Sequence, residues 1–164
     1  MSSPQHLLEK HHAEMARAAA ASMHGHHAET VEICSELLTS SLYADLETAG
    51  MKEDARRARA ECRLLMATAM HYTGTHHEDV LKVLNFALDS PPEIQRDAYF
   101  TIAVVELSNE RADNARVAMQ QCLAIIGDLR RAGFADPEGR MEQQETEALE
   151  FLAGLETGEG GVIH

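Results

Sequence analysis

Apolar side chains recur along this chain every three or four residues, in blocks that stop at glycine, asparagine or proline. That spacing matches the 3.6-residue period of an α-helix that buries one face. We therefore predict helices over about 3–23, 27–46, 52–73, 111–131 and 137–155. Two more are expected between Thr75 and Asn109, divided at Ser90-Pro91-Pro92. No stretch alternates apolar and polar residues as a half-buried strand would.

The weakest part of this pattern is the segment 40–54, which is compatible with an extension of the second helix or with an irregular loop.

Several predicted helix ends carry residues that are typical of helix termini. Asn109 is expected to take the left-handed conformation that stops a helix. Thr75 and Glu78 have the spacing of a capping box, and Asp136, followed by proline, is expected to open the last helix.

Parts of the helical pattern are repeated. Residues 23–31 are echoed by 72–80 and, more weakly, by 107–115, and each copy leads from one helical pattern into a second. A chain that repeats a helical hairpin usually stacks the hairpins into a solenoid. We predict an all-α stack of three helical hairpins with a C-terminal capping helix. It would form one domain over 1–156, followed by a flexible tail over 157–164.

The third hairpin resembles a tetratricopeptide repeat, in which two antiparallel helices of about 34 residues in all pack through small side chains. Six of its residues match the aromatic, apolar and small positions of that repeat: Tyr99, Ile102, Ala103, Ala115, Met119 and Cys122. The chain departs from the family because it has no tryptophan. The wide separation of Gly25 from Gly74 is a second departure.

The resemblance implies that the first helix of each hairpin lines a concave groove for a segment of another protein. The groove positions assigned to partner binding are Met23, Leu64, Thr68, His71, Phe100, Val104 and Leu107. The lining is mostly apolar and lacks a Lys/Arg clamp for a carboxylate, which favours an amphipathic helix or an extended apolar segment as ligand.

The expected function is therefore that of a non-enzymatic scaffold or chaperone. Two alternatives stay open. Two copies of the chain are expected to be able to pair into a homodimer, because an open solenoid end must be capped or paired. Alternatively, the last helix covers the groove itself through four apolar residues: Leu149, Phe151, Leu152 and Leu155.

Charge and cysteine content narrow the class of protein. The formal net charge is −13, which disfavours nucleic acid and anionic membranes as partners. No apolar run is long enough to span a bilayer, and residues 1–6 do not resemble a secretory signal.

The spacing of the cysteines does not match that of a metal-binding pair. They are Cys34, Cys62 and Cys122. We interpret them as buried, reduced thiols of a cytoplasmic protein, with a redox-active thiol as the alternative.

Histidine supports a second hypothesis. The chain has 10 histidines, and six of them fall at two predicted hairpin turns: His24, His26, His27, His71, His76 and His77. Neutral imidazoles beside acidic residues suit a divalent metal such as Zn²⁺. The same cluster would sense pH as the imidazoles gain charge near their ordinary pKa of about 6.5. The alternative is that these are solvated turn residues and that the protein holds no cofactor.

No catalytic residue is predicted. The chain lacks a glycine-rich phosphate loop, an HExxH motif and a nucleophile elbow. Acidic residues near the end of the chain, Glu145, Glu147 and Glu150, are interpreted as a solvated helix face.

Overall fold

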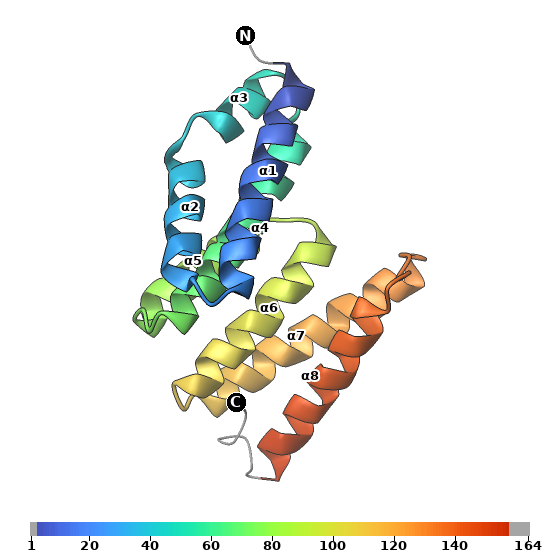
Figure 1. Ribbon diagram of the computed structural model, residues 1–164. Coiled ribbons are helices and arrows are strands. Elements are labelled where there is room, and N and C mark those ends of the chain that lie inside the picture. The colour runs from blue at the N-terminus through green and yellow to red at the C-terminus, as the bar shows by residue number, and fades with distance from the viewer. Residues whose placement is uncertain (1–2, 158–164) are drawn as a thin grey trace. The chain divides into compact units, whose positions relative to one another are not determined.

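Residues 3–157 are described by the computed structural model, and every regular element in that stretch is an α-helix (Figure 1). The predicted all-α class is confirmed. None of the helices in this stretch is long and apolar enough to cross a membrane. In chain order the helices are α1 Pro4–Met23, α2 His27–Thr39, α3 Leu42–Thr48, α4 Lys52–Tyr72, α5 His77–Ala87, α6 Pro92–Ser108, α7 Ala112–Arg131 and α8 Arg140–Glu156.

The chain divides into two compact units, one ending at Ser90 and the other beginning at Pro91. In the first unit α1 packs against α2, α2 against α4, and α4 against α5. In the second, α6 packs against α7 and α7 against α8. The stacking of three hairpins as one domain over 1–156 stays a prediction. Of the predicted tail 157–164, only Thr157 lies within the described residues.

Each unit has its own hydrophobic core. In the first unit the helix contacts use small side chains, among them Ala18, Cys34 and Cys62, none of which exposes any surface. Side chains of this size let neighbouring backbones approach closely. In the second unit the core is built around α7, where Met119 is fully buried, and Phe151 of α8 joins the same cluster.

A separate short helix, α3, replaces the predicted helix extension or loop. The second helix ends at Thr39 rather than near Leu46, because Ser40 has an extended backbone with ψ 169°. The Ser40 hydroxyl donates to the carbonyl of Leu37 at 2.6 Å and accepts from the amide of Leu42 at 3.3 Å. Serine thereby competes with the helical backbone hydrogen bonds, and the chain restarts as a new helix.

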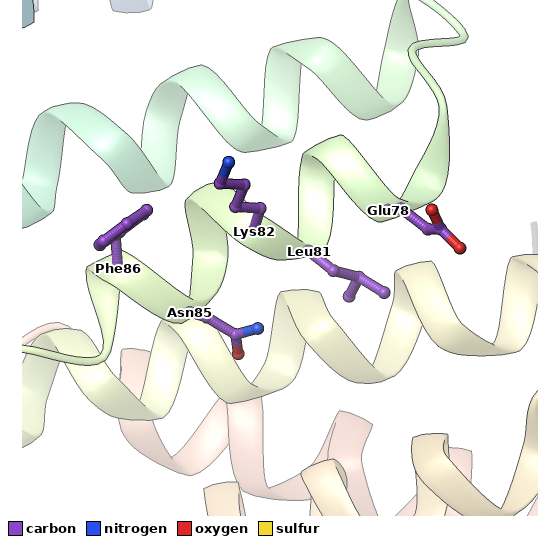
Figure 2. A pocket seen from close by; sticks show the side chains of 5 residues that line it. All are labelled: Glu78, Leu81, Lys82, Asn85 and Phe86. Carbon is purple, nitrogen blue, oxygen red and sulfur yellow. The ribbon is translucent and has the colours of Figure 1, made fainter.

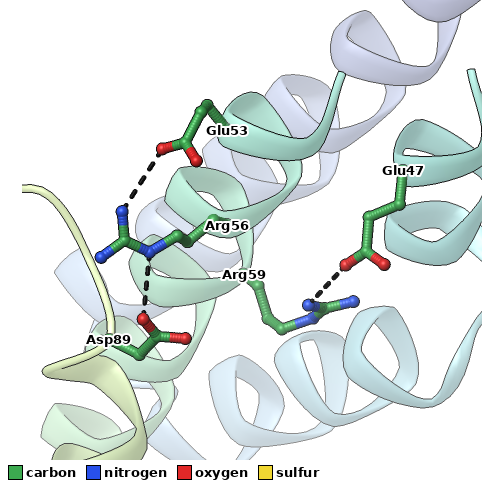
Figure 3. A network of polar contacts seen from close by, with 5 residues as sticks. All are labelled: Glu47, Glu53, Arg56, Arg59 and Asp89. Carbon is green, nitrogen blue, oxygen red and sulfur yellow. Dashed lines mark hydrogen bonds and ion pairs between the residues drawn. The ribbon is translucent and has the colours of Figure 1, made fainter. Parts of the chain in front are cut away.

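The docking of α3 onto α4 depends mainly on Tyr43, which is buried. Arg59 of α4 lies over the Tyr43 ring, 5.6 Å from its centroid. Arg59 also donates to Glu47 of α3 at 2.9 Å (Figure 3). One turn earlier on α4, Arg56 donates to Asp89 at 3.0 Å. Ion pairs this exposed contribute little to stability, so the buried ring is the larger stabilising contact.

The predicted capping box at the start of α5 is wrong. The amide of Thr75 donates to the carbonyl of Met70 at 3.0 Å and so belongs to the closing turn of α4. Its neighbour His76 is the N-cap of α5 instead, and the His76 Nδ1 accepts from the amide of Glu78 at 3.3 Å. The side chain that caps α5 therefore comes from His76 rather than from Thr75.

The predicted left-handed residue in the third turn is also wrong. Glu110 has φ 62°, whereas Asn109 has φ −105°. The side-chain amide of Asn109 donates to the carbonyl of Val105 at 2.9 Å. A non-glycine residue in the left-handed region is uncommon. It is held there because the amide of Arg111 donates to the carbonyl of Glu106 at 2.9 Å, which closes the turn.

The last helix begins at Arg140 rather than directly after Asp136-Pro137, because a turn ending at Gly139, with φ 67°, intervenes. Asp136 caps the helix across that turn. Its two carboxylate oxygens accept from the amides of Met141 and Glu142, each at 3.1 Å. The hydrogen bond from the Met141 amide is the main reason why the pKa of Asp136 lies below its ordinary value.

We expect the substitution Asp136→Asn to remove an acid-sensitive contribution to the stability of α8. The folded pKa of Asp136 is depressed, so its contribution is present above the unfolded pKa of 3.8 and is lost as the pH falls through the folded value. The measurement is amide exchange of Met141 and Glu142 across that pH range. Equal pH dependence in the wild type and the variant would contradict the capping role.

Candidate functional site

One side of α1 presents a row of small and apolar side chains. Ala13, Ala16, Ala20 and Met23 are all exposed, and Met23 exposes 87% of its surface. Residues at these spacings lie along one side of a helix. Because alanine covers little of the backbone, another chain can approach this side of α1 closely.

The predicted groove residues of α4 lie on a helix that contacts α1. Leu64, Thr68 and His71 are half-buried and follow helical spacing. The hydroxyl of Thr68 donates to the carbonyl of Leu64 at 2.9 Å, so Thr68 presents mainly its methyl group for contact. We call these three residues, together with the α1 row from Ala13 to Met23, the α1–α4 face.

The α1–α4 face ends at a group of aromatic rings. Tyr72 exposes 66% of its surface and stacks on His27, with ring centroids 4.8 Å apart and an interplanar angle of 22°. The ring of His71 lies 5.8 Å from that of Tyr72. Near the end of α1, the hydroxyl of Ser22 lies 3.4 Å from Nδ1 of His27. Sequence reasoning missed Tyr72, whose only signal is its place at the last turn before Gly74.

Near the middle of α4, a polar chain leads from the surface into the core. The side chain of Glu61 is 35% exposed, and its Oε2 lies 3.4 Å from Nε2 of His11. His11 exposes no surface, and its Nδ1 lies 3.0 Å from the hydroxyl of Tyr43. Both ring nitrogens of this buried histidine therefore have a partner, as a buried polar group requires.

The protonation of Tyr43 limits how this chain can be arranged. Burial, and after it the neighbouring Cys62 thiol, raises the pKa of Tyr43, so the hydroxyl keeps its proton at neutral pH. Tyr43 can therefore donate to Nδ1 of His11, while the opposite ring nitrogen of His11 faces Glu61.

The predicted groove residues of the second unit have a structural role. Phe100, Val104 and Leu107 are half-buried and pack against the core cluster that also contains Phe151 of α8. Leu149, which was expected to join Phe151 in covering the groove, is exposed instead. A polar substitution at Phe100 would therefore disturb the core of the second unit as well as any binding surface.

The turn histidines form pairs rather than a larger cluster. The rings of His24 and His26 lie 6.3 Å apart, and those of His76 and His77 stack at 4.5 Å. The other two contact Tyr72 as described above. Within residues 3–157, no group of three or more His, Cys, Asp or Glu side chains is placed to hold a metal ion. The hypothesis of a metal-binding or pH-sensing site stays a prediction.

A second surface lies on α5. An open pocket there is lined by Glu78, Leu81, Lys82, Asn85 and Phe86 (Figure 2). The Phe86 ring is exposed, and the guanidinium of Arg63 lies 5.1 Å from its centroid. A cation over an aromatic face is a favourable contact, so this arrangement holds an exposed ring in a defined position. Sequence reasoning did not single out Phe86.

Comparison of the chain with protein-family models, with curated proteins and with solved structures found no significant match. What the chain does has to be inferred from the side chains described above.

Proposed function

We propose that this protein is a non-enzymatic protein-interaction module, built like a tetratricopeptide-repeat protein, whose α1–α4 face receives an apolar segment of a partner protein. The observation that carries this proposal is the exposure of Met23 and Tyr72 beside a row of small side chains. Methionine and tyrosine are enriched at the centres of protein interfaces. Methionine also adapts its shape to irregular partner surfaces.

An amphipathic helix is the ligand that suits the α1–α4 face best. The row from Ala13 to Met23 runs for about 15 Å along α1, which is the length of about three turns of a partner helix. A partner helix would place apolar side chains at every third or fourth position onto this row. Such a module would act as a scaffold or chaperone that shields the apolar side of its partner.

The packing within the first unit supports the comparison with tetratricopeptide repeats. There α1 contacts α2, α2 contacts α4, and α4 contacts α5, through small buried side chains such as Ala18 and Ala67. This order is what consecutive antiparallel hairpins require. The helix α3 is an additional element between the two hairpins, and it accounts for the wide separation of Gly25 from Gly74.

We expect the substitutions Met23→Asp and Tyr72→Asp to weaken partner binding at least about tenfold, because each places a charge in an apolar contact. The wild type and both variants would be used for affinity capture with quantitative mass spectrometry, followed by calorimetric titration of the partner so identified. The matched control is Val117→Asp on α7, since Val117 is also an exposed apolar residue. Circular dichroism would check that all variants fold.

Loss of binding in the Met23 and Tyr72 variants alone would support the α1–α4 face as the site. If both variants bind the partner as tightly as the wild type and the Val117 variant do, the proposal is wrong.

A further inference from the structure

The open pocket on α5 combines an exposed aromatic ring with two positive charges. Phe86 exposes 54% of its surface, and the guanidinium of Arg63 from α4 lies over its ring. Lys82 also lines the pocket, and it lies four residues before Phe86, which is about one helical turn. Figure 2 shows the side chains of Lys82 and Phe86 pointing to the same side of α5. Both cations therefore border the exposed ring.

Arg63 has no acidic partner among residues 3–157. The two arginines that precede it on this side of α4 are paired, because Arg59 donates to Glu47 at 2.9 Å and Arg56 donates to Asp89 at 3.0 Å. Arg63 is half-buried, and its pKa is lowered, first by burial and then by the charge of Arg59. Its charge is thus partly removed from water without a carboxylate to balance it, and a ligand that brings one would be favoured.

Lys82 is an exposed cation that also lacks an acidic partner in the described part of the chain. Glu78 lies four residues before it, at the spacing of a helical ion pair, but no ion pair joins these two described residues. Figure 2 shows their side chains pointing in different directions. The pocket is therefore acidic at the Glu78 end and basic where Lys82 and Arg63 border the ring.

The rest of the pocket offers apolar surface and an amide. Leu81 is half-buried and Asn85 is exposed, and Figure 2 shows both side chains on the other side of α5 from Lys82. An amide side chain both donates and accepts, so Asn85 can pair with the backbone of an extended segment. The volume of the pocket is about 440 Å³, which lies in the range of ligand-binding pockets.

We propose that the α5 pocket binds an acidic linear segment of a partner protein, in which a large apolar side chain is flanked by glutamate or aspartate. The apolar side chain lies against Leu81 and the Phe86 ring, and a flanking carboxylate accepts from Arg63 and Lys82. Because Glu78 would repel a carboxylate, the acidic residue of the ligand lies at the Phe86 end.

Charge complementarity argues for this occupant. A basic segment would meet Arg63 and Lys82 as like charges, and a neutral one would leave both without a partner. The chain as a whole is negative, with a net charge of −13. Its more distant acidic groups act weakly, because exposed charges are screened beyond about 8 Å at physiological ionic strength. The site uses none of the residues of the α1–α4 face, so this proposal and the one above stand or fall separately.

Two synthetic peptides test the charge requirement on the full-length protein. Both are acetylated and amidated, so that neither has a terminal charge. One has the sequence Ala-Glu-Phe-Glu-Ala, and the other has glutamine in place of glutamate. Each is titrated into isotope-labelled protein and followed by NMR. We expect the glutamate peptide to shift the amide signals of residues 78–86 saturably. It should bind at least about fivefold more tightly than the glutamine peptide, and added salt should reduce this preference.

Three substitutions locate the interaction. Lys82→Gln removes a cation at an exposed position, so it changes the charge with little effect on packing, and Arg63→Gln removes the other cation. We expect each to reduce the preference for the glutamate peptide at least about twofold. Phe86→Ala should weaken the binding of both peptides. The matched control is Lys10→Gln, which removes an exposed lysine of α1 and should leave the preference unchanged. Circular dichroism checks that all variants fold.

Equal affinity of the wild type for the two peptides would overturn the proposal, as would the absence of a saturable shift in α5. The proposal is also wrong if Lys82→Gln and Arg63→Gln both keep the wild-type preference. Shifts confined to the surroundings of Met23 and Tyr72 would place the peptide on the α1–α4 face and exclude the α5 pocket as its site.

Discussion

The substitution Tyr43→Ala is expected to lower the free energy of unfolding of the first unit by about 3–5 kcal/mol, the range for removing a buried aromatic side chain. Tyr43 exposes only 2% of its surface and is among the largest fully buried side chains. It holds α3 against its neighbours, and its hydroxyl is the partner of Nδ1 of His11. The alanine variant loses both the packing of the ring and that hydrogen bond.

Tyr43→Phe separates these two losses. It keeps the ring and leaves the buried His11 nitrogen without its partner, which costs about 1–3 kcal/mol. Urea unfolding followed by circular dichroism measures both variants, and amide exchange shows whether α3 opens first. If the alanine and phenylalanine variants were equally destabilised, the packing of the ring would contribute nothing, and α3 would have to be held by other contacts.

The second large effect is expected in the other unit. Met119→Ala should destabilise it by about 2–5 kcal/mol, because a fully buried long side chain is replaced by a short one and leaves a cavity. Met119 lies in the middle of α7 and belongs to the cluster that also contains Ile126 and Phe151. The cost depends on how far these neighbours can close the space.

Val117→Ala is the matched control for Met119→Ala. Val117 lies two residues away on the same helix but is exposed, so its truncation should change stability by no more than about 0.5 kcal/mol. Denaturant unfolding should show a lower midpoint with an unchanged slope for Met119→Ala. A loss below about 1 kcal/mol for Met119→Ala would mean that α7 does not organise this core.

The helices were predictable because each depends on a local pattern. The bounds expected for the first, third and sixth helices, 3–23, 52–73 and 111–131, differ from those of α1, α4 and α7 by a residue at most. The errors lie where several local hydrogen bonds compete. Ser40 turned the predicted continuation of α2 into a break, because its hydroxyl satisfies backbone groups on both sides.

The candidate site was only partly predictable. Helical spacing placed Met23 and His71 on the side expected to face a partner, and the structure leaves Met23 almost fully exposed. Whether this side binds a partner stays a prediction. The same pattern could not show that Phe100 packs against the core of the second unit, because an apolar stripe has the same spacing on a core side and on a binding side of a helix.

The amino-acid sequence by itself determined the helical class, the approximate helix ends and the acidic character of this protein, because periodicity, capping residues and charge act over a few residues. The meeting of His11, Tyr43 and Glu61, and of Cys34 with Cys62, was decided only by the tertiary structure. These side chains come from four helices, α1 to α4, and up to 50 residues separate a contacting pair. No local pattern encodes such a contact, because it exists only once the helices have packed.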